Sequence, residues 1–143
     1  MTAAPGSRPW LLDTSALMAF IEDEAGADRV ERALEQPTTL VPWPVLLETH
    51  YVTLQERGQA EADHRIALIE QLNVNFVWDM DESTLLTASR LKAERRVSLA
   101  DAIIAAFAIR GGAVLMHKDP ELGALTGLLP MEELPYKSSV GSS

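Results

Sequence analysis

Residues 10–17, Trp-Leu-Leu-Asp-Thr-Ser-Ala-Leu, decide the fold of this chain. A short apolar run followed by an acid and then by further apolar residues is typical of a buried strand that leads directly into a helix. Asp13 is well suited to begin that helix, because aspartate is a favoured N-cap residue. We therefore expect a strand over 10–13 and a helix from there to about Ile21.

The same alternation of strand and helix continues along the rest of the chain. Periodicity and punctuation by proline and glycine predict these further elements. The strands are expected over 38–41, 74–78, 113–116 and 128–131, and the helices over 25–35, 45–57, 60–72, from Asp81 or Ser83 to 94, and from Ser98 to the Gly111-Gly112 pair. Strands separated by helices need crossover connections, which give parallel pairing. The expected fold is α/β: a single three-layer α/β/α domain with a mostly parallel sheet of four to five strands.

Length and composition indicate a single domain. A chain of 143 residues with 47% hydrophobic residues can form one well-packed core. We expect that domain over 10–134, with flexible tails over 1–9 and 135–143. The absence of cysteine excludes disulfides and thiolate chemistry. No apolar run is long enough to cross a bilayer and no signal peptide is recognisable, so a soluble, cytoplasmic protein is expected.

The net charge of −9 is the opposite of what bulk electrostatic binding to nucleic acid requires. An acidic protein can still act on RNA when bound cations offset its carboxylates and a few basic residues line the approach. The local supply of such residues is a basic run, Arg90, Lys92, Arg95 and Arg96. The alternative is that this run is an ordinary solvated helix face.

Two acids are predicted at the edge where open α/β sheets bind their ligands, beyond the carboxyl ends of the strands. Asp13 ends the first strand, and Asp119 follows the fourth. A purely structural role is open for each of them. Asp13 can simply cap its helix, and Asp119, which precedes Pro120, can simply begin a turn or helix.

Two further acids interrupt apolar helices. Asp101 is the single charge in the apolar segment 99–109, and a helix that is apolar all round is buried. A capping box with Ser98 is the structural alternative, although Asp reaches less far than the preferred Glu. Glu48 borders the expected core near the start of its helix, where the helix dipole alone would favour an acid.

The joint placement of these acids says more than any one of them. Four separate elements deliver Asp13, Glu48, Asp101 and Asp119 toward one end of the sheet. Clustered carboxylates repel one another and retain protons unless cations neutralise them. Oxygen ligands of this kind suit Mg²⁺ or Mn²⁺, which can activate water and stabilise a phosphoryl displacement.

The four acids stand in four motifs: Leu12-Asp13-Thr14-Ser15-Ala16-Leu17, Leu47-Glu48, Ser98-Leu99-Ala100-Asp101-Ala102-Ile103-Ile104-Ala105 and Lys118-Asp119-Pro120-Glu121. In their order and spacing these motifs resemble those of the PIN-domain nucleases and, within them, the VapC-type toxins. The similarity covers nearly the whole chain outside the tails.

The resemblance implies a toxin that hydrolyses single-stranded RNA with Mg²⁺ or Mn²⁺. Asp13, Glu48 and Asp101 would bind metal directly or through water, with Asp119 completing the cluster. Ser15 matches a hydroxyl that supports the first aspartate, and an ordinary first-turn serine is the alternative. The resemblance further implies a homodimer and an inhibiting antitoxin protein. The chain departs from the pattern at His117, where relatives often carry Thr; we expect that histidine at a surface strand end.

Two rival functions remain open. An enzyme that uses Asp13 as a phosphoryl-accepting nucleophile is one. Phosphatases of the haloacid-dehalogenase type need a second aspartate at the position of Ser15, and phospho-receiver domains need an acidic pair that Thr14 interrupts. The other rival is a catalytically silent PIN-fold module for protein interaction, which the intact acid set disfavours.

Overall fold

The structure is a computed structural model that describes residues 7–136. The tails expected over 1–9 and 135–143 therefore lie largely outside the described residues. The elements, in chain order, are β1 (Trp10–Leu12), α1 (Thr14–Ile21), α2 (Ala27–Leu34), β2 (Leu40–Pro42), α3 (Trp43–Arg57), α4 (Gln59–Glu70), β3 (Asn75–Val77), α5 (Glu82–Glu94), α6 (Leu99–Arg110), β4 (Val114–His117), the 3₁₀ helix η1 (Pro120–Leu125) and β5 (Met131–Glu133).

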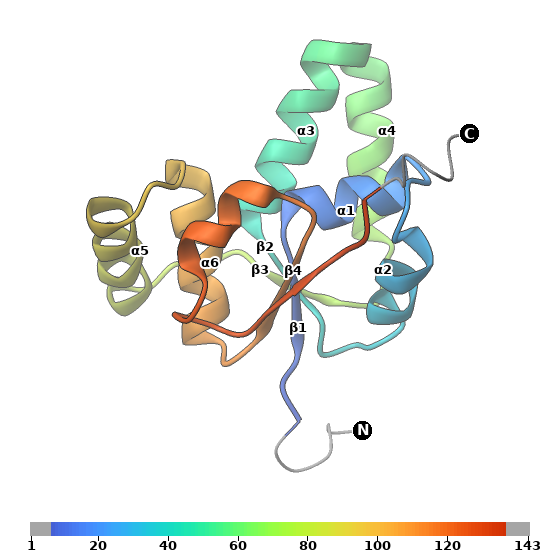
Figure 1. Ribbon diagram of the computed structural model, residues 1–143. Coiled ribbons are helices and arrows are strands. Elements are labelled where there is room, and N and C mark those ends of the chain that lie inside the picture. The colour runs from blue at the N-terminus through green and yellow to red at the C-terminus, as the bar shows by residue number, and fades with distance from the viewer. Residues whose placement is uncertain (1–6, 137–143) are drawn as a thin grey trace.

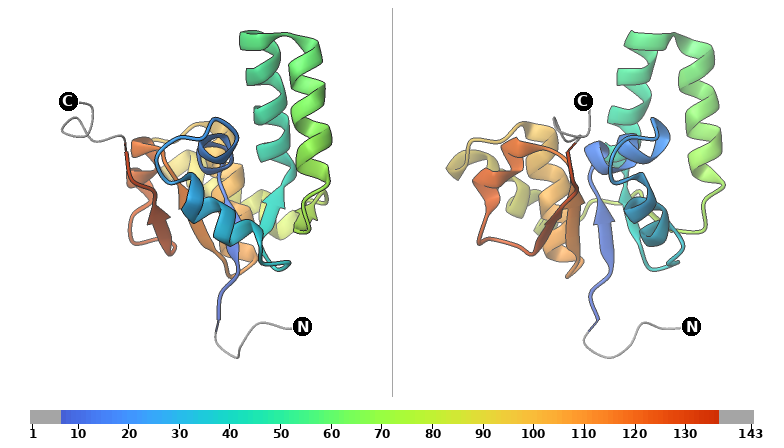
Figure 2. Two further views of the ribbon diagram at one scale, coloured as in Figure 1. Left: turned by 90° about the vertical axis from the view of Figure 1, so that its right-hand side faces the viewer. Right: turned by 45° about the vertical axis from the view of Figure 1, so that its right-hand side comes forward.

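The five strands form one sheet in the order β3-β2-β1-β4-β5, and every neighbouring pair is parallel. The first strand lies in the middle, with Leu11 opposite Leu40 on one side and Leu115 on the other. Right-handed crossovers place α1 to α4 on one face of the sheet and α5 and α6 on the other (Figures 1 and 2). The predicted three-layer α/β/α fold with a parallel sheet is confirmed.

The core runs through the central strands and the helix that covers them. Leu11, Leu12, Leu115 and Met116 are completely buried. Helix α6 is buried over most of its surface, as its apolar sequence predicted, and its buried residues include Asp101. Within residues 7–136, no helix combines the length and the apolar character that crossing a membrane would require.

The chain after β4 departs from the prediction. The fifth strand, expected over 128–131, lies instead at Met131–Glu133. The residues before it form the loop that follows the end of η1 at Leu125. Gly127 takes the left-handed conformation with φ 88°, and Pro130 has no N–H to donate to a strand neighbour. Leu129 is buried all the same. Its apolar character reflects burial of a loop and not strand geometry, which is why the sequence pattern misplaced β5.

Helices α3 and α4 form a hairpin that rises beyond the edge where the strands end (Figure 1). Gly58, with φ 90°, makes the turn between them. The buried guanidinium of Arg65 ties the hairpin to the end of α1: it lies 2.9 Å from a Glu22 carboxylate oxygen and donates to the Thr53 hydroxyl at 3.2 Å. Because α3 carries Glu48, this tie fixes one of the predicted acids relative to the sheet.

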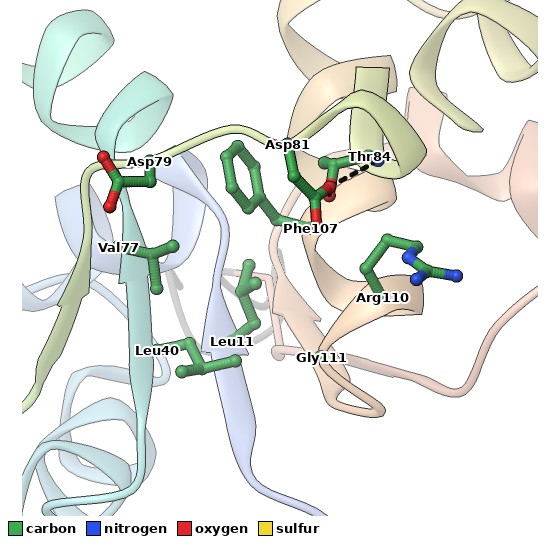
Figure 3. Close-up of a pocket in the computed structure, with 9 residues that line it drawn as sticks. All are labelled: Leu11, Leu40, Val77, Asp79, Asp81, Thr84, Phe107, Arg110 and Gly111. Atoms are coloured by element: carbon green, nitrogen blue, oxygen red, sulfur yellow. Dashed lines mark hydrogen bonds between the residues drawn. The ribbon is translucent and has the colours of Figure 1, made fainter. Parts of the chain in front are cut away.

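A cavity of about 280 Å³ opens on the face of the sheet that α5 and α6 cover (Figure 3). Its walls are largely apolar, with Asp79, Asp81 and Arg110 among the polar residues that line it. None of the four acids singled out in the sequence lines this cavity. The acidic site lies elsewhere, at the carboxyl edge of the sheet.

Candidate metal centre

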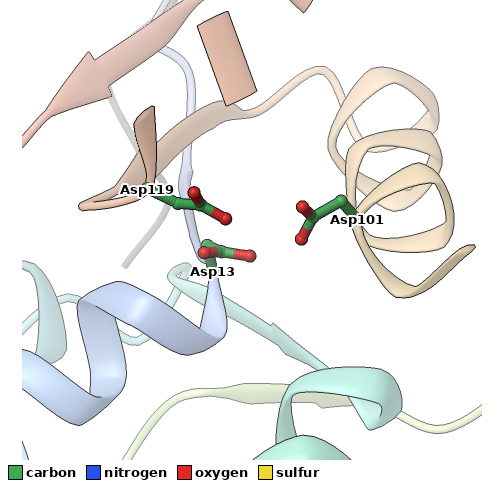
Figure 4. A group of neighbouring side chains, drawn as sticks. All are labelled: Asp13, Asp101 and Asp119. Carbon is green, nitrogen blue, oxygen red and sulfur yellow. The ribbon is translucent and has the colours of Figure 1, made fainter. Parts of the chain in front are cut away.

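Three aspartates converge where β1 and β4 end. Asp13 directly follows β1, Asp119 follows β4, and Asp101 projects from the first turn of α6. Each offers a carboxylate oxygen, and the three oxygens lie within 4.8 Å of one another (Figure 4). Parallel pairing explains the approach of the first two, because the ends of neighbouring parallel strands coincide. The Asp13 N–H donates to the Met116 carbonyl at 2.9 Å and locks this register.

Asp13 is both a helix cap and an incompletely satisfied acid. Its Oδ2 accepts the Ser15 N–H at 3.1 Å and the Ser15 hydroxyl, so the capping role predicted for it is real. Its Oδ1 is buried and has no hydrogen-bond partner within residues 7–136. A buried carboxylate oxygen without a partner costs free energy, so capping accounts for only one of the two oxygens.

In Asp119, too, one carboxylate oxygen caps a helix and the other does not. Its Oδ1 accepts the Glu121 N–H at 3.0 Å and begins η1, as expected for an acid that precedes proline. The hydrogen bonds of the described residues do not engage its Oδ2. The structural and functional interpretations of Asp13 and Asp119 are therefore compatible, since each side chain can cap with one oxygen and bind with the other.

Asp101 is 6% exposed, and its backbone N–H donates to the Ser98 Oγ at 3.1 Å. Ser98 thus caps α6. Among residues 7–136 no hydrogen bond joins the Ser98 backbone N–H to the Asp101 carboxylate, so the reciprocal bond of a capping box is not formed, although the Ser98 hydroxyl lowers the pKa of Asp101 in part. The carboxylate faces Asp13 and Asp119 instead (Figure 4). Burial, reinforced by the nearby negative charges, raises the pKa of Asp101 to about 7.

Glu48 belongs to the same site but lies outside the group of three. The Thr14 hydroxyl donates to its Oε1 at 2.6 Å, which holds the carboxylate toward the start of α1. Burial raises the pKa of Glu48, and the charges of Asp13 and Asp119 add to that effect. Because α3 begins at Trp43, Glu48 lies in the second turn and not in the first. The helix dipole therefore does not explain this acid.

Ser15 joins the two strand ends that carry the aspartates. Its hydroxyl donates to Asp13 and accepts the Lys118 N–H at 2.8 Å. One side chain thus connects the first turn of α1 with the residue just after β4. A hydroxyl that supports the first aspartate would make these contacts, and the bond from the Lys118 N–H is one that an ordinary first-turn serine does not need.

His117 is not at a surface strand end, as the sequence led us to expect, but buried at 3% exposure. Its Nδ1 accepts the Asp119 N–H at 3.1 Å, so the proton of the neutral ring is on Nε2. The ring therefore orients the backbone of the fourth acid. Sequence reasoning missed this role, and it also missed Thr14. His117 is the last residue of β4, Thr14 is the first residue of α1, and each lies within two residues of a predicted acid, which is the signal that could have identified both.

The donor set fits a divalent cation that prefers oxygen. Burial raises the pKa of Asp13 as well as those of Glu48 and Asp101, so the metal-free cluster resists carrying its full negative charge. A cation at the three aspartates would offset that repulsion and give the Asp13 Oδ1 its missing partner. Carboxylates without nitrogen or sulfur ligands match Mg²⁺ or Mn²⁺.

The fold and the site define a class: an α/β protein with an acidic edge that could hold a divalent cation, a combination suited to phosphoryl chemistry. The family follows from the sequence, since the family model of the PIN domain matches residues 10–128. The chain belongs to the PIN domain family. None of the curated proteins matches it.

Solved structures of VapBC proteins and of a VapC toxin share this fold. VapBC2 from Rickettsia felis bound to a promoter DNA fragment has a TM-score of 0.71 and 16% identity, covering 88% of this chain and 98% of that chain. DNA-bound VapBC from Salmonella typhimurium has a TM-score of 0.70 and 19% identity, covering 89% and 98%. VapC20 from Mycobacterium tuberculosis, described as a sarcin-ricin-loop-cleaving toxin, has a TM-score of 0.66 and 19% identity, covering 82% and 95%. At these identities the similarity shows the fold alone.

Proposed function

We propose that the protein is a metal-dependent endoribonuclease that hydrolyses single-stranded RNA and serves as the toxin of a toxin–antitoxin pair. One observation carries the proposal: the Asp13 Oδ1 is buried, has no hydrogen-bond partner among residues 7–136, and belongs to a group of three carboxylates whose oxygens lie within 4.8 Å of one another. Membership of the PIN domain family supports it, and so does the fold shared with VapC20, which is described as a sarcin-ricin-loop-cleaving toxin.

Asp13, Asp101 and Asp119 would hold the metal in this proposal, and Glu48, which lies outside the group of three, would reach it through water. Bound Mg²⁺ or Mn²⁺ supplies Lewis-acid activation of water and stabilisation of negative charge on phosphate. Ser15 keeps Asp13 oriented through its hydroxyl. Hydrolysis adds the oxygen of water to phosphorus and breaks one P–O ester bond, leaving a phosphate monoester on one fragment and a hydroxyl on the other.

The antitoxin would dock on the exposed face of α3. Leu47, Tyr51 and Leu54 are 56%, 42% and 41% exposed and recur at the spacing of one helix face. An apolar stripe of this kind suits an amphipathic partner segment. Leu47 directly precedes Glu48, so a basic residue of the partner could reach the acidic cluster. Three of the similar structures are described as VapBC or toxin–antitoxin complexes, which supports this part of the proposal.

We further propose a cytoplasmic homodimer. Light scattering of the purified protein should then give a mass of twice 15.7 kDa. Co-expression with the product of an adjacent open reading frame should give a complex that Leu47→Asp weakens. If the Leu47→Asp variant bound its partner with unchanged affinity, the antitoxin would bind at a surface other than the exposed face of α3.

The test of the activity is cleavage of single-stranded RNA in the presence of Mn²⁺ or Mg²⁺. We expect cleavage that EDTA stops and that Asp101→Asn abolishes while the circular dichroism spectrum stays unchanged. Retained activity in the Asp101→Asn variant would overturn the metal-cluster mechanism. Absence of Mn²⁺ binding by calorimetry at millimolar concentration, together with absence of cleavage, would instead favour the silent interaction module.

A further inference from the structure

We propose that Arg95 and Arg96, in the connection between α5 and α6, bind the phosphate backbone of RNA beside the metal centre. The inference rests on the proposed function, because it names the surface that the substrate of that site would contact. It starts from the distribution of positive charge in an acidic protein.

Most basic side chains of the chain are either paired or far from the site. Eleven Lys and Arg residues lie within residues 7–136, and five of them lie within 4.0 Å of a carboxylate: Arg29, Arg32, Arg57, Arg65 and Lys118. The six without such a carboxylate in this part of the chain are Arg8, Arg90, Lys92, Arg95, Arg96 and Arg110. Free positive charge is therefore concentrated in one segment, 90–96.

Arg95 and Arg96 are the members of that segment closest in sequence to the acids. Helix α5 ends at Glu94 and α6 begins at Leu99, so both arginines lie in the short connection just before the Ser98 cap. Both are exposed. Asp101 lies six positions after Arg95, so the Cα atoms of the two residues are at most about 22 Å apart, a distance that a few nucleotides can span.

Geometry places this connection at the same edge of the sheet as the acids. Helix α6 starts at the carboxyl edge with Asp101 and runs back to Arg110, from which the chain enters β4 (Figure 1). Arg95 and Arg96 precede the first end of α6, whereas Arg110 marks the opposite end. Arg8, just before β1, also lies at the opposite edge of the sheet.

Charge explains why the phosphates next to the cleaved one need these arginines. A metal ion neutralises the carboxylates and the reacting phosphate, but the flanking phosphates still approach a protein of net charge −9. Guanidinium groups bind phosphate with two parallel hydrogen bonds and remain charged at any relevant pH. Within residues 7–136 no carboxylate, not even that of the neighbouring Glu94, lies within 4.0 Å of either arginine, so both guanidinium groups are open to a phosphate from outside this part of the chain.

The experiment compares two double variants that remove equal charge: Arg95→Gln/Arg96→Gln at the proposed surface and Arg8→Gln/Arg110→Gln at the opposite edge. The probe is a fluorescein-labelled, mixed-sequence 20-nucleotide single-stranded RNA. Its binding is followed by anisotropy between 50 and 200 mM NaCl in an Asp101→Asn background, so that cleavage does not intervene. Mn²⁺ binding to the same variants with Asp101 intact checks that the metal centre is unchanged.

We expect the Arg95/Arg96 variant to bind RNA about 10-fold to 100-fold more weakly at 50 mM NaCl. Loss of two phosphate contacts should flatten the dependence of log affinity on log salt by about 1.4. The Arg8/Arg110 variant should stay within about 2-fold of the parent. Equal weakening in both variants, or no weakening in the first, would overturn the inference. Absence of RNA cleavage by the unsubstituted protein would defeat the proposed function separately, because the binding comparison does not depend on cleavage.

Discussion

Two aspartates, Asp13 and Asp81, each cap a helix soon after a strand, but their pKa values are shifted in opposite directions. Asp81 begins α5, and its Oδ1 accepts the Thr84 N–H at 2.8 Å and the Thr84 hydroxyl at 2.7 Å. Those hydrogen bonds lower the pKa of Asp81, which is exposed. Asp13 begins α1 and receives the same kind of bonds from Ser15, yet burial outweighs them and raises its pKa.

The difference shows what makes a capping aspartate part of a site. Both caps satisfy helix N–H groups, and both pair an aspartate with a hydroxyl on the first turn. Of the two, only Asp13 is buried, has a carboxylate oxygen with no hydrogen-bond partner in the part of the chain that the structure describes, and lies within 4.8 Å of two further carboxylates. The two aspartates thus make the same kind of local hydrogen bonds. The function we propose depends instead on the burial of Asp13 and on its closeness to Asp101 and Asp119.

The largest expected contrast is in catalysis. Asp13→Asn should lower RNA cleavage by more than about 100-fold, because it removes charge at the oxygen that lacks a partner, whereas Asp81→Asn should stay within about 2-fold. The measurement is kcat/KM on single-stranded RNA with saturating Mn²⁺. Equal losses in the two variants would mean that the comparison reflects folding and not chemistry.

Metal-dependent stability should separate the same two variants. A ligand that binds only the folded state adds about 2.7 kcal/mol to the free energy of unfolding at a concentration 100 times its dissociation constant. Thermal unfolding with and without Mn²⁺ should therefore show a clear rise in Tm for the parent protein and for Asp81→Asn. Asp13→Asn should show little or none, and a full rise in that variant would exclude Asp13 as a ligand.

The pH dependence of stability should have opposite signs for a buried acid of the cluster, Asp101, and for the exposed cap Asp81. In the metal-free folded protein the pKa of Asp101 is about 7, above its ordinary value of 3.8. The folded state then holds that proton more tightly, so its contribution lowers the free energy of unfolding as pH rises from about 4 through 7. In EDTA, Asp101→Asn should be more stable than the parent at pH 8, on the order of 2 kcal/mol, and the gap should close toward pH 4.

Asp81 provides the control for that experiment. Its pKa is lowered in the folded state, so its contribution is present at neutral pH and is lost as pH falls. Asp81→Asn should therefore be less stable than the parent at pH 7, with a difference that shrinks in acid. Urea unfolding at several pH values measures both variants, and the same sign for both would contradict the assigned environments.

The smallest contrast concerns the hydroxyl groups beside the two caps. Thr14→Val removes the 2.6 Å bond to Glu48 and should lower kcat/KM by about 10-fold through misplacement of that carboxylate. Thr84→Val removes one bond to the Asp81 cap and should lower Tm by a few degrees, about 3 °C, with kcat/KM unchanged. A Thr14→Val variant with full activity would remove Thr14 from the site.

The sequence predicted the fold because local patterns determine it: short apolar runs, helix caps and glycine stops fix the alternation of elements and hence the parallel sheet. It brought the four acids to one edge by the same argument. It favoured Asp101, as the single charge in an apolar helix, but it could not show that the buried oxygen without a partner among residues 7–136 belongs to Asp13, because hydrogen-bond partners are known only from the structure. It also misplaced β5, because Leu129, before Met131, is buried in a loop and not in a strand. It placed His117 at the surface, because a polar side chain at a strand end gives no sign in the sequence that it is buried.

The order of strands in the sheet has a consequence for the protein while it is being synthesised. β1 leaves the ribosome first, but it lies at the centre of the sheet and pairs with β4, more than a hundred residues later. Ser15, likewise, reaches its partner at Lys118 only then. A nascent chain cannot assemble the three aspartates until Asp119 has emerged, so translation itself delays the appearance of the site until the last of its acids is in place.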